Sequence, residues 1–276
     1  MVKITASDVN MLRQQTGAGM MDCKKALVEA DGNIEEATDL LRKQGQKIAA
    51  KRGEREATEG YILAKTDQTD KLGVVISLNC ETDFVARTED FVNYAKTIVD
   101  LALENKIDTI EGLKTTTFNG STIQDGIIAM SGKIGEKIEL SSYKKIESES
   151  VIAYNHPGNK LASLIGLNKG GDNIKEVGKD IAMQVAAMNP VAIEPEGVDA
   201  ETIDREIEIG KEQARQAGKP EEIVEKIAMG KLNKFYKECT LLNQQFIKDS
   251  KKTVKQYLSE AENDLSVTSF NRLALG

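Results

Sequence analysis

The residues able to do acid–base or nucleophilic chemistry are few and scattered along this chain. It has one histidine, His156, in a polar stretch, and three widely spaced cysteines, Cys23, Cys80 and Cys239. No serine or cysteine nucleophile motif accompanies the histidine, so a contact residue in a turn is favoured over a general base. The glycines follow no phosphate-loop pattern, and the cysteines fit neither a disulfide framework nor a zinc site. We therefore expect no covalent chemistry, no bound nucleotide, no metal and no cofactor.

The strongest local signal is an aromatic residue on a strand-to-helix connection within residues 79–91. Before it, the apolar and β-branched segment 73–78 predicts a buried strand. After it, apolar residues from Phe91 onward recur at helical spacing, and Thr88 is a suitable N-cap for that amphipathic helix. Four residues are thereby left on the connection, namely Thr82, Asp83, Phe84 and Val85.

The ring of Phe84 has two interpretations. A phenylalanine near a helix start usually packs on its own domain, and the pattern by itself favours that buried position. An N-cap at Asp83 would place Phe84 inside the first helical turn and would strengthen this interpretation. The alternative is a ring that points outward to a partner. For the function of the chain, a small-molecule enzyme that uses the Asp83 region is a weaker hypothesis.

Composition narrows the class of protein. The chain has 276 residues, with 40% hydrophobic and 29% charged, which is typical of a globular protein with two or more folding units. Its formal net charge of −7 argues against nucleic acid or an anionic membrane as the main partner. No apolar run approaches the ~20 residues of a membrane span, and the start lacks the apolar core of a signal peptide. With its odd cysteine count, the sequence therefore favours a cytoplasmic location.

Residues 1–54 predict a small module of three helices. Ser7 is the expected N-cap of the first helix, and the third is expected to stop at Gly45. Met20 and Met21 begin the second helix, and we expect one of them buried and the other exposed. So short a bundle buries little apolar area, which favours a docking module on a tether.

A charged tether, residues 47–55, precedes a change from helical to period-two patterning. Its composition favours a solvated helix extension over a phosphate contact. Segments 60–64 and 72–78 predict a hairpin, which two helices cover and which the strand from Ile138 joins. This unit is the predicted core subdomain N, residues 55–147.

The hairpin-plus-helix arrangement then recurs. Strands over 151–154 and 161–167 precede a helix over 173–188, and strand residues near the end of the chain are expected to return to this second sheet. Sheets with one face that needs a helix layer predict an α+β fold. We expect a structural duplication, with equal strand order in the two sheets. The second subdomain, C, comprises residues 148–190 and 239–276.

Residues 191–238 predict an inserted antiparallel helical hairpin of the coiled-coil type. Its turn has Gly218 after one helix and Pro220 at the opening of the next. The apolar faces of such helices are buried against each other or against a second chain. A homodimer through this hairpin is therefore left open.

Taken together, these features resemble the bacterial elongation factor Ts family, the nucleotide exchange factors for the GTPase elongation factor Tu. The resemblance extends from Ile4 to the final strand, essentially the whole chain. Two matching stretches are highly specific in their order and spacing, and the hairpin tip is a weak match alone. The two specific runs are residues 16–23 and 82–85. All the matching parts are residues 12–27, the turn 82–86, His156 in its hairpin, and the tip 218–220.

The resemblance implies a fold and a mechanism. The first module would be UBA-like, and the turn 82–85 would push into the GTPase beside its nucleotide site. There it would displace Mg²⁺ from the GDP form, loosen the phosphate loop and promote GDP release so that GTP can bind. The turn contributes Thr82, Asp83, Phe84 and Val85 to the contact. Further contacts would fall on Arg13, Met20, Met21, Ile134, Gly135 and His156. The hairpin mediates dimers in some members only.

The free energy that such an effect requires can be compared with the free energy that the contact residues can supply. Lowering nucleotide affinity about a thousandfold takes about 4 kcal/mol. Burying one phenylalanine supplies roughly 1.5–3 kcal/mol, so Phe84 would need further contacts as an anchor. By reciprocity, incoming nucleotide would equally weaken the factor. The competing class is a generic adaptor, whose first module captures a peptide while the α+β body acts as a scaffold.

Overall fold

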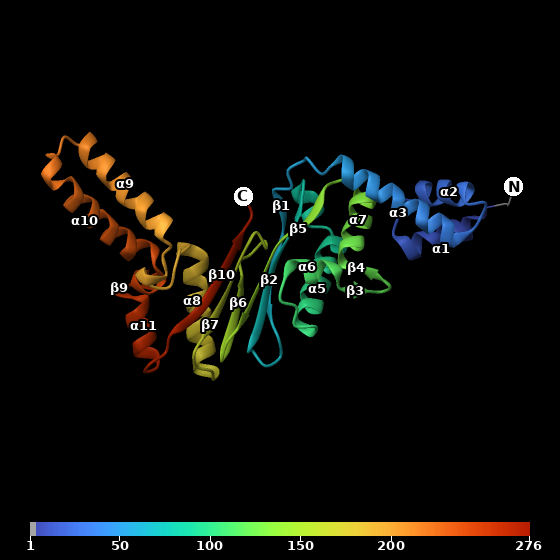
Figure 1. The fold of residues 1–276 in the computed structure, drawn as a ribbon. Helices are drawn as coiled ribbons and strands as arrows, with labels where there is room; N and C mark the ends of the chain where they lie inside the picture. The colour runs from blue at the N-terminus through green and yellow to red at the C-terminus, as the bar shows by residue number, and fades with distance from the viewer. Residues whose placement is uncertain (1–3) are drawn as a thin grey trace.

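The computed structural model describes residues 4–276, so the first three residues of the predicted module 1–54 lie outside the described residues. The fold is mixed α+β, as predicted. Two antiparallel sheets face each other at the centre, and helices cover their outer sides (Figure 1). A helical module at the N-terminal end and a helical hairpin at the opposite end extend from this body.

The first sheet has the order β1-β2-β5, with all pairs antiparallel. The strands are β1 (Glu59–Thr66), β2 (Leu72–Cys80) and β5 (Ile138–Glu147). Its outer face is covered by α5 (Glu89–Glu104), α6 (Ile110–Thr115) and α7 (Ile123–Ile134), beside a small hairpin of β3 (Thr117–Phe118) and β4 (Ser121–Thr122). Strand β2 is buried along almost its whole length because it lies centrally with both faces covered, which explains its continuous apolar run.

The second sheet has the order β10-β7-β6, which repeats the topology of the first. In each sheet a hairpin is followed by a helix, and a third strand then pairs with the hairpin's second strand. This agreement of strand order is what the predicted duplication requires. The elements are β6 (Ser150–Asn155), β7 (Leu161–Leu167), α8 (Asp172–Met188), α11 (Val254–Ala261) and β10 (Val267–Ala274).

The inner faces of the two sheets pack directly on each other. A buried apolar cluster fills this interface, with Ile62 and Val75 from the first sheet and Val151 and Leu164 from the second. Gly73 marks the closest approach, because a Cβ built there would lie 2.6 Å from Val151 Cγ1 and 2.7 Å from Leu164 Cδ1. Only glycine fits this crossing without displacing the other sheet.

The N-terminal module consists of α1 (Ala6–Thr16), α2 (Met20–Glu29) and α3 (Ile34–Lys51). Its first N-cap is Thr5, so the prediction of Ser7 is wrong. Thr5 Oγ1 accepts a bond from Asp8 N at 3.2 Å, and the Asp8 carboxylate accepts one from Thr5 N at 2.8 Å. This reciprocal capping box stabilises a helix start two residues earlier than predicted.

Helix α3 does not stop at Gly45, as predicted, but continues to Lys51. Gly45 is buried where α3 crosses α7, and a Cβ built on Gly132 would lie 2.8 Å from Gly45 Cα. The glycine is therefore required by a close helix crossing, which sequence spacing alone does not distinguish from a helix end. The predicted tether is in part the last turn of this helix, and the module packs on the core through α7.

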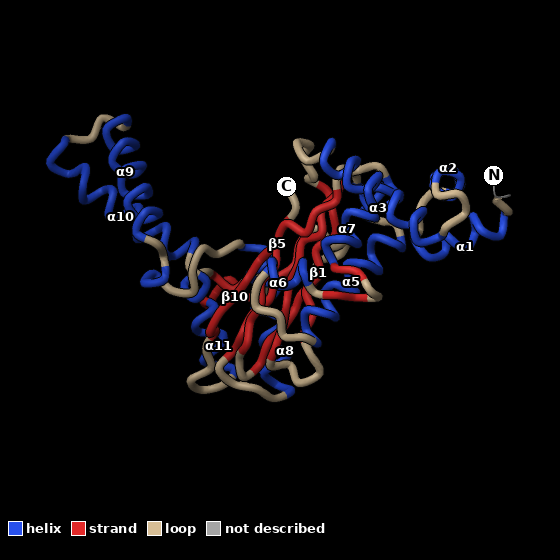
Figure 2. Tube along the Cα trace, turned by 45° about the vertical axis from the view of Figure 1, so that its right-hand side comes forward, coloured by secondary structure: helices blue, strands red, loops and turns tan. Residues whose placement is uncertain are grey.

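The helical hairpin is formed by α9 (Ala200–Gln216) and α10 (Glu221–Cys239) and extends away from the body (Figures 1 and 2). Its two helices pack closely, since a Cβ on Gly210 would lie 3.0 Å from Ala228 Cα. Backbone bonds from Val191 to Cys239 and from Leu241 to Ala192 close its base. The short segments η1 (Pro195–Gly197), η2 (Leu241–Asn243), β8 (Gln245–Phe246) and β9 (Asp249–Thr253) complete this side.

Candidate protein-binding site

The aromatic turn is a single helical turn, α4 (Asp83–Ala86), between β2 and α5. Thr82 is its N-cap and accepts a long bond of 3.5 Å from Val85 N, so the alternative N-cap at Asp83 is wrong. Thr88 precedes α5 in the N-cap position, as predicted, but its hydroxyl donates to Val85 O at 2.9 Å instead of capping. The turn is thus bonded at both of its ends.

Phe84 is 81% exposed, as the family resemblance implies, and the buried position favoured by the sequence pattern alone is wrong. The next two residues, Val85 and Ala86, are buried in the core between the first sheet and its helices. Because consecutive residues of a helical turn point in different directions, burying these two directs the ring outward. Asp83 and Arg87 form an ion pair of 2.8 Å on the same turn.

Two carboxylates hold the turn from neighbouring segments. Glu136, in the loop between α7 and β5, accepts bonds from Thr82 N at 3.0 Å and from Thr82 Oγ1 at 2.7 Å. In the opposite direction, Glu81 accepts a bond from Lys137 N at 2.6 Å. Neither glutamate was singled out from the sequence, since their pairing joins segments more than fifty residues apart.

Glu81 also receives two arginines from the segment that follows α3. Arg52 lies 2.8 Å and Arg55 3.1 Å from its two carboxylate oxygens. Burial acts to raise the pKa of the Glu81 carboxyl, but the Lys137 N–H and the two guanidiniums outweigh it and lower the pKa to about 2. A charged carboxylate therefore joins the aromatic turn to the N-terminal module.

The predicted residues Ile134 and Gly135 lie at the end of α7, next to Glu136. Gly135 caps this helix in the left-handed conformation, with φ of 80°. Lys133 directly precedes Ile134 in the helix, and its Nζ lies 2.6 Å from Asp90 Oδ2 at the start of α5. The end of α7 is thereby brought beside the helix that follows the aromatic turn.

Met20 and Met21 are both exposed, at 53% and 62%, so the prediction that one is buried is wrong. The core-facing side of α2 is supplied by residues further along it, including Cys23 and Leu27, and its first turn stays outside. Arg13 and Met20 line a groove of about 510 Å³, to which Lys133 of α7 also contributes. Its other lining residues are Asn10, Gln14, Gly17, Ala18 and Gly19.

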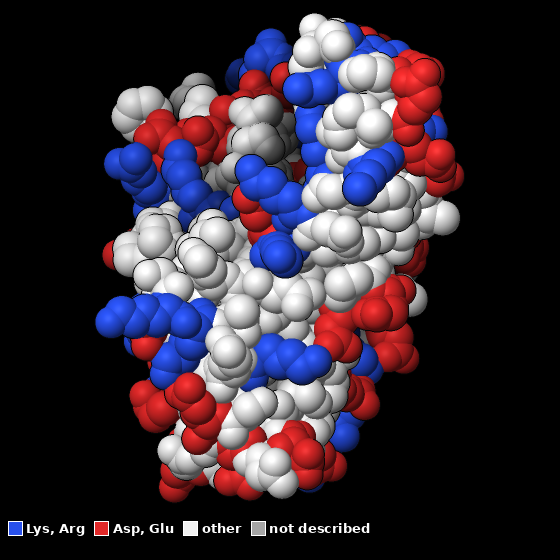
Figure 3. All heavy atoms as spheres, turned by 90° about the vertical axis from the view of Figure 1, so that its left-hand side faces the viewer, with Lys and Arg blue, Asp and Glu red and all other residues white. Residues whose placement is uncertain are grey.

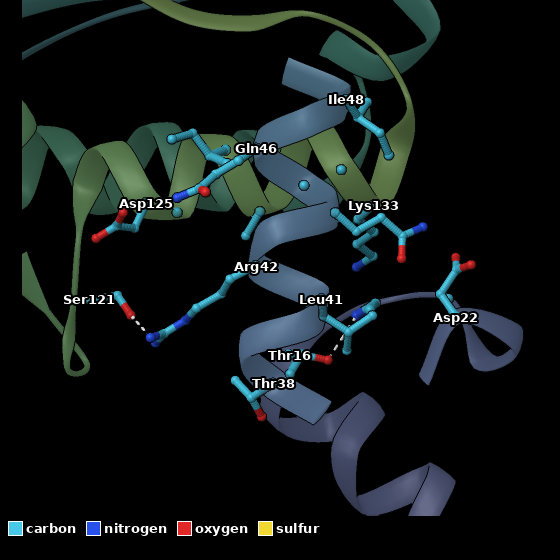
Figure 4. Close-up of a pocket in the computed structure, with 18 of the residues that line it drawn as sticks. Thr16, Asp22, Thr38, Leu41, Arg42, Gln46, Ile48, Ser121, Asp125 and Lys133 are labelled. Carbon is cyan, nitrogen blue, oxygen red and sulfur yellow. Dashed lines mark hydrogen bonds between the residues drawn. The ribbon is translucent and has the colours of Figure 1, made fainter. Parts of the chain in front are cut away.

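A second cavity, of about 330 Å³, lies at the junction of the N-terminal module with α7 (Figure 4). In the close-up Arg42 extends from α3 toward Ser121, and the two side chains bond at 3.3 Å. Thr16 and Asp22 reach the cavity from the first two helices, and Lys133 from α7. Both cavities therefore lie between the N-terminal module and α7, and Lys133 lines both of them.

His156 is exposed in the turn between β6 and β7, with Nδ1 2.9 Å from the Tyr154 hydroxyl. This turn is bonded to the first sheet, since Asn159 O accepts from Ile62 N at 2.7 Å and Lys160 pairs with Glu59 at 2.7 Å. Glu59 is the register partner of Cys80, which lies just before the aromatic turn. The histidine and the aromatic turn therefore lie at the same end of the sheets.

Comparison with known proteins gives concordant matches. A family model described as Elongation factor TS matches residues 81–276. Two relatives are each 50% identical to this chain over 276 residues, with 100% of both chains covered. They are Elongation factor Ts from Christiangramia forsetii and Elongation factor Ts from Flavobacterium psychrophilum. The corresponding protein from Amoebophilus asiaticus is 50% identical over 274 residues, with 99% of each chain covered.

These matches, together with the α+β fold, place the chain among the translation elongation factors. The chain belongs to the elongation factor Ts family. Over the described residues 4–276, none of the helices is long and apolar enough to span a membrane.

Proposed function

We propose that this chain is a guanine-nucleotide exchange factor for elongation factor Tu. It binds the GDP form of that GTPase, displaces Mg²⁺ and promotes GDP release so that GTP can bind. The observation that carries the proposal is the exposed ring of Phe84 on a turn whose next two residues are buried. An aromatic ring on a fixed support can insert into a partner with little loss of conformational freedom.

The remaining exposed residues of the site extend the contact. Burial of one phenylalanine supplies roughly 1.5–3 kcal/mol, less than the ~4 kcal/mol of a thousandfold loss in nucleotide affinity. Met20, Met21 and Arg13 on the UBA-like module, and His156 at the same end of the sheets, add apolar and polar surface. In this proposal Phe84 is the wedge and these residues are the anchor.

The chemistry requires no covalent step in this chain. Mg²⁺ neutralises phosphate charge in the GTPase, so its displacement weakens nucleotide binding. Affinity is coupled reciprocally, so incoming GTP weakens the factor and releases it for another cycle. The factor therefore acts at concentrations below that of its partner. Its location is the cytoplasm, where translation elongation occurs.

On the side of the molecule that carries the helical hairpin, the charge distribution favours a protein partner over nucleic acid (Figure 3). Viewed from the side of the helical hairpin, Lys and Arg are interspersed with Asp and Glu around uncharged surface (Figure 3). A nucleic-acid-binding face carries a continuous basic patch, which this face does not have. The helical hairpin has exposed apolar residues at Ile209, Ile223 and Met229, which support its proposed use in a homodimer.

The deciding experiment follows labelled GDP bound to elongation factor Tu, in Mg²⁺ buffer, after addition of this protein at a fraction of the GTPase concentration. Exchange activity releases more GDP than the amount of protein added. Release at the spontaneous rate would overturn the proposal and favour the adaptor. A second arm adds excess Mg²⁺, which should slow release if Mg²⁺ displacement is part of the mechanism.

A further inference from the structure

Two neighbouring loops beside the aromatic turn are joined by hydrogen bonds, and each loop supplies one glutamate carboxylate that accepts from the other. Glu136 accepts from the backbone and hydroxyl of Thr82, and Glu81 accepts from the backbone of Lys137. We call this pair of reciprocal contacts the carboxylate clasp. Its two glutamates precede Thr82 and Lys137 directly in the chain, so each segment both offers a carboxylate and receives one.

The clasp contributes contacts that the turn itself lacks. Within α4 the cap bond from Val85 N to Thr82 Oγ1 is long, at 3.5 Å, and the bond from Ala86 N to Thr82 O is 3.3 Å. Both bonds of Thr82 to Glu136 are shorter and involve a carboxylate, which makes them stronger. Phe84 has few contacts of its own because it is exposed, so its direction depends on how the turn is held, by Val85 and Ala86 in the core and by Thr82 at the N-cap.

The same clasp connects the aromatic turn with the N-terminal module. Arg52, directly after α3, bonds Glu81 with its side chain 28% exposed and the glutamate 14% exposed. Arg55 is more exposed, at 58%, so solvent screens its pair more strongly. Lys137 Nζ also donates to Gly53 O at 3.1 Å in the same segment. The module's connection and the turn are thus attached to adjacent residues.

We propose that Glu136 and Glu81 are positioning residues for the exchange reaction. Glu136 holds α4 so that Phe84 points outward, and Glu81 keeps the segment after α3 in place beside it. This inference rests on the proposed function for its effect on exchange, while its effect on the turn itself is measurable without any partner.

The first experiment uses the free, full-length protein. Amide hydrogen exchange is measured at Val85 and Ala86 in the wild type, in Glu136→Ala and in the matched control Glu139→Ala. Glu139 lies nearby, and its ion pair uses Lys137 Nζ, so its removal leaves the backbone bond from Lys137 N to Glu81 in place. Glu136→Ala should speed exchange at these amides about tenfold while Glu139→Ala leaves it unchanged. Equal protection in all three proteins would overturn the proposal.

The second experiment measures the saturating rate of GDP release from elongation factor Tu. Glu136→Ala should lower this rate about tenfold, and Glu136→Gln should restore most of it because the amide still bonds Thr82. In a Phe84→Ala background, Glu136→Ala should have little further effect, since it acts through the ring. Additive losses would show a general structural role and overturn the proposal.

The two experiments separate the clasp from the proposed function. Wild-type protein that fails to accelerate GDP release removes the exchange function, while the amide experiment still decides whether Glu136 holds the turn. If the wild-type protein accelerates release and Glu136→Ala is equally active and equally protected, only the proposal about the clasp is overturned. Glu81→Gln retains the clasp bond from Lys137 N but loses the charge opposite Arg52, so it tests the link between the clasp and the N-terminal module.

Discussion

Gly45 of α3 and Gly132 of α7 face each other at a helix crossing so close that a Cβ on Gly132 would lie 2.8 Å from Gly45 Cα. Two helices reach this separation only where neither has a side chain at the crossing. The crossing sets the position of the N-terminal module, and with it Met20 and Met21, relative to the aromatic turn.

Gly132→Ala should therefore disturb the packing of the N-terminal module on α7 more than the helical structure of α7 itself. The added methyl meets backbone, which cannot move aside as a side chain can, and we expect a loss of about 1–3 kcal/mol. Thermal unfolding and GDP release measure the effect. The matched control is Gly230→Ala on α10, where a Cβ meets nothing within 4 Å and alanine favours the helix by roughly 0.5–1 kcal/mol. Similar midpoints for both variants would contradict the structural role of the crossing.

Phe84 and Phe91 make a matched pair, with the same side chain exposed at one position and buried in the core at the other. Phe91 is fully buried, so Phe91→Ala should lower the free energy of unfolding by about 3–5 kcal/mol. Phe84→Ala should change stability by less than about 0.5 kcal/mol because the ring is exposed. It should nevertheless slow GDP release about tenfold or more, since the ring is buried only against the partner. Denaturant unfolding and exchange kinetics together test both halves, and a large stability loss on Phe84→Ala would contradict the wedge.

The pKa of Glu81, lowered to about 2, gives a prediction about pH. A carboxylate whose folded-state pKa is below its unfolded value stabilises the fold above the unfolded pKa, near 4.5, and loses this contribution as pH falls toward 2. Glu81→Gln should therefore unfold at a lower temperature than wild type near pH 7, and the difference should narrow between pH 5 and about pH 2. Calorimetry across this range is the measurement. A constant difference would show that the carboxylate charge does not stabilise the fold.

The exposed apolar residues of the helical hairpin predict concentration-dependent association. Replacing Ile209, Ile223 and Met229 with serine should shift a dimer toward monomer in sedimentation velocity, because apolar contact drives such association. Val28→Ser, at an exposed apolar residue of α2 in the N-terminal module, is the control and should leave the equilibrium unchanged. A wild type that stays monomeric at high concentration would remove the hairpin dimer, without consequence for exchange by the aromatic turn.

Local sequence signals were sufficient where periodicity and turn chemistry act over a few residues. The strands of both hairpins, the helix after Thr88 and the turn at Gly218 are where the sequence predicts them, because short apolar runs, apolar residues at helical spacing and a left-handed glycine are encoded nearby. The return of the last strand to the second sheet followed from its β-branched and aromatic residues.

Tertiary contacts decided the rest. Phe84 is exposed because Val85 and Ala86 occupy the core, and Met20 and Met21 are exposed because later residues of α2 fill the module's interior. In each case the amino acid is compatible with either environment, so its own pattern does not select one.

The sequence by itself determined the α+β class, the order of the elements and, through its motifs, the family to which the chain belongs. Only the tertiary structure revealed that Glu136 bonds Thr82 while Glu81 bonds Lys137. It also revealed that α3 continues through Gly45 instead of ending there. The physical reason is range, since a cap or a strand pattern acts within a few residues. A carboxylate contact or a helix crossing depends on chain segments that meet only when the protein is folded.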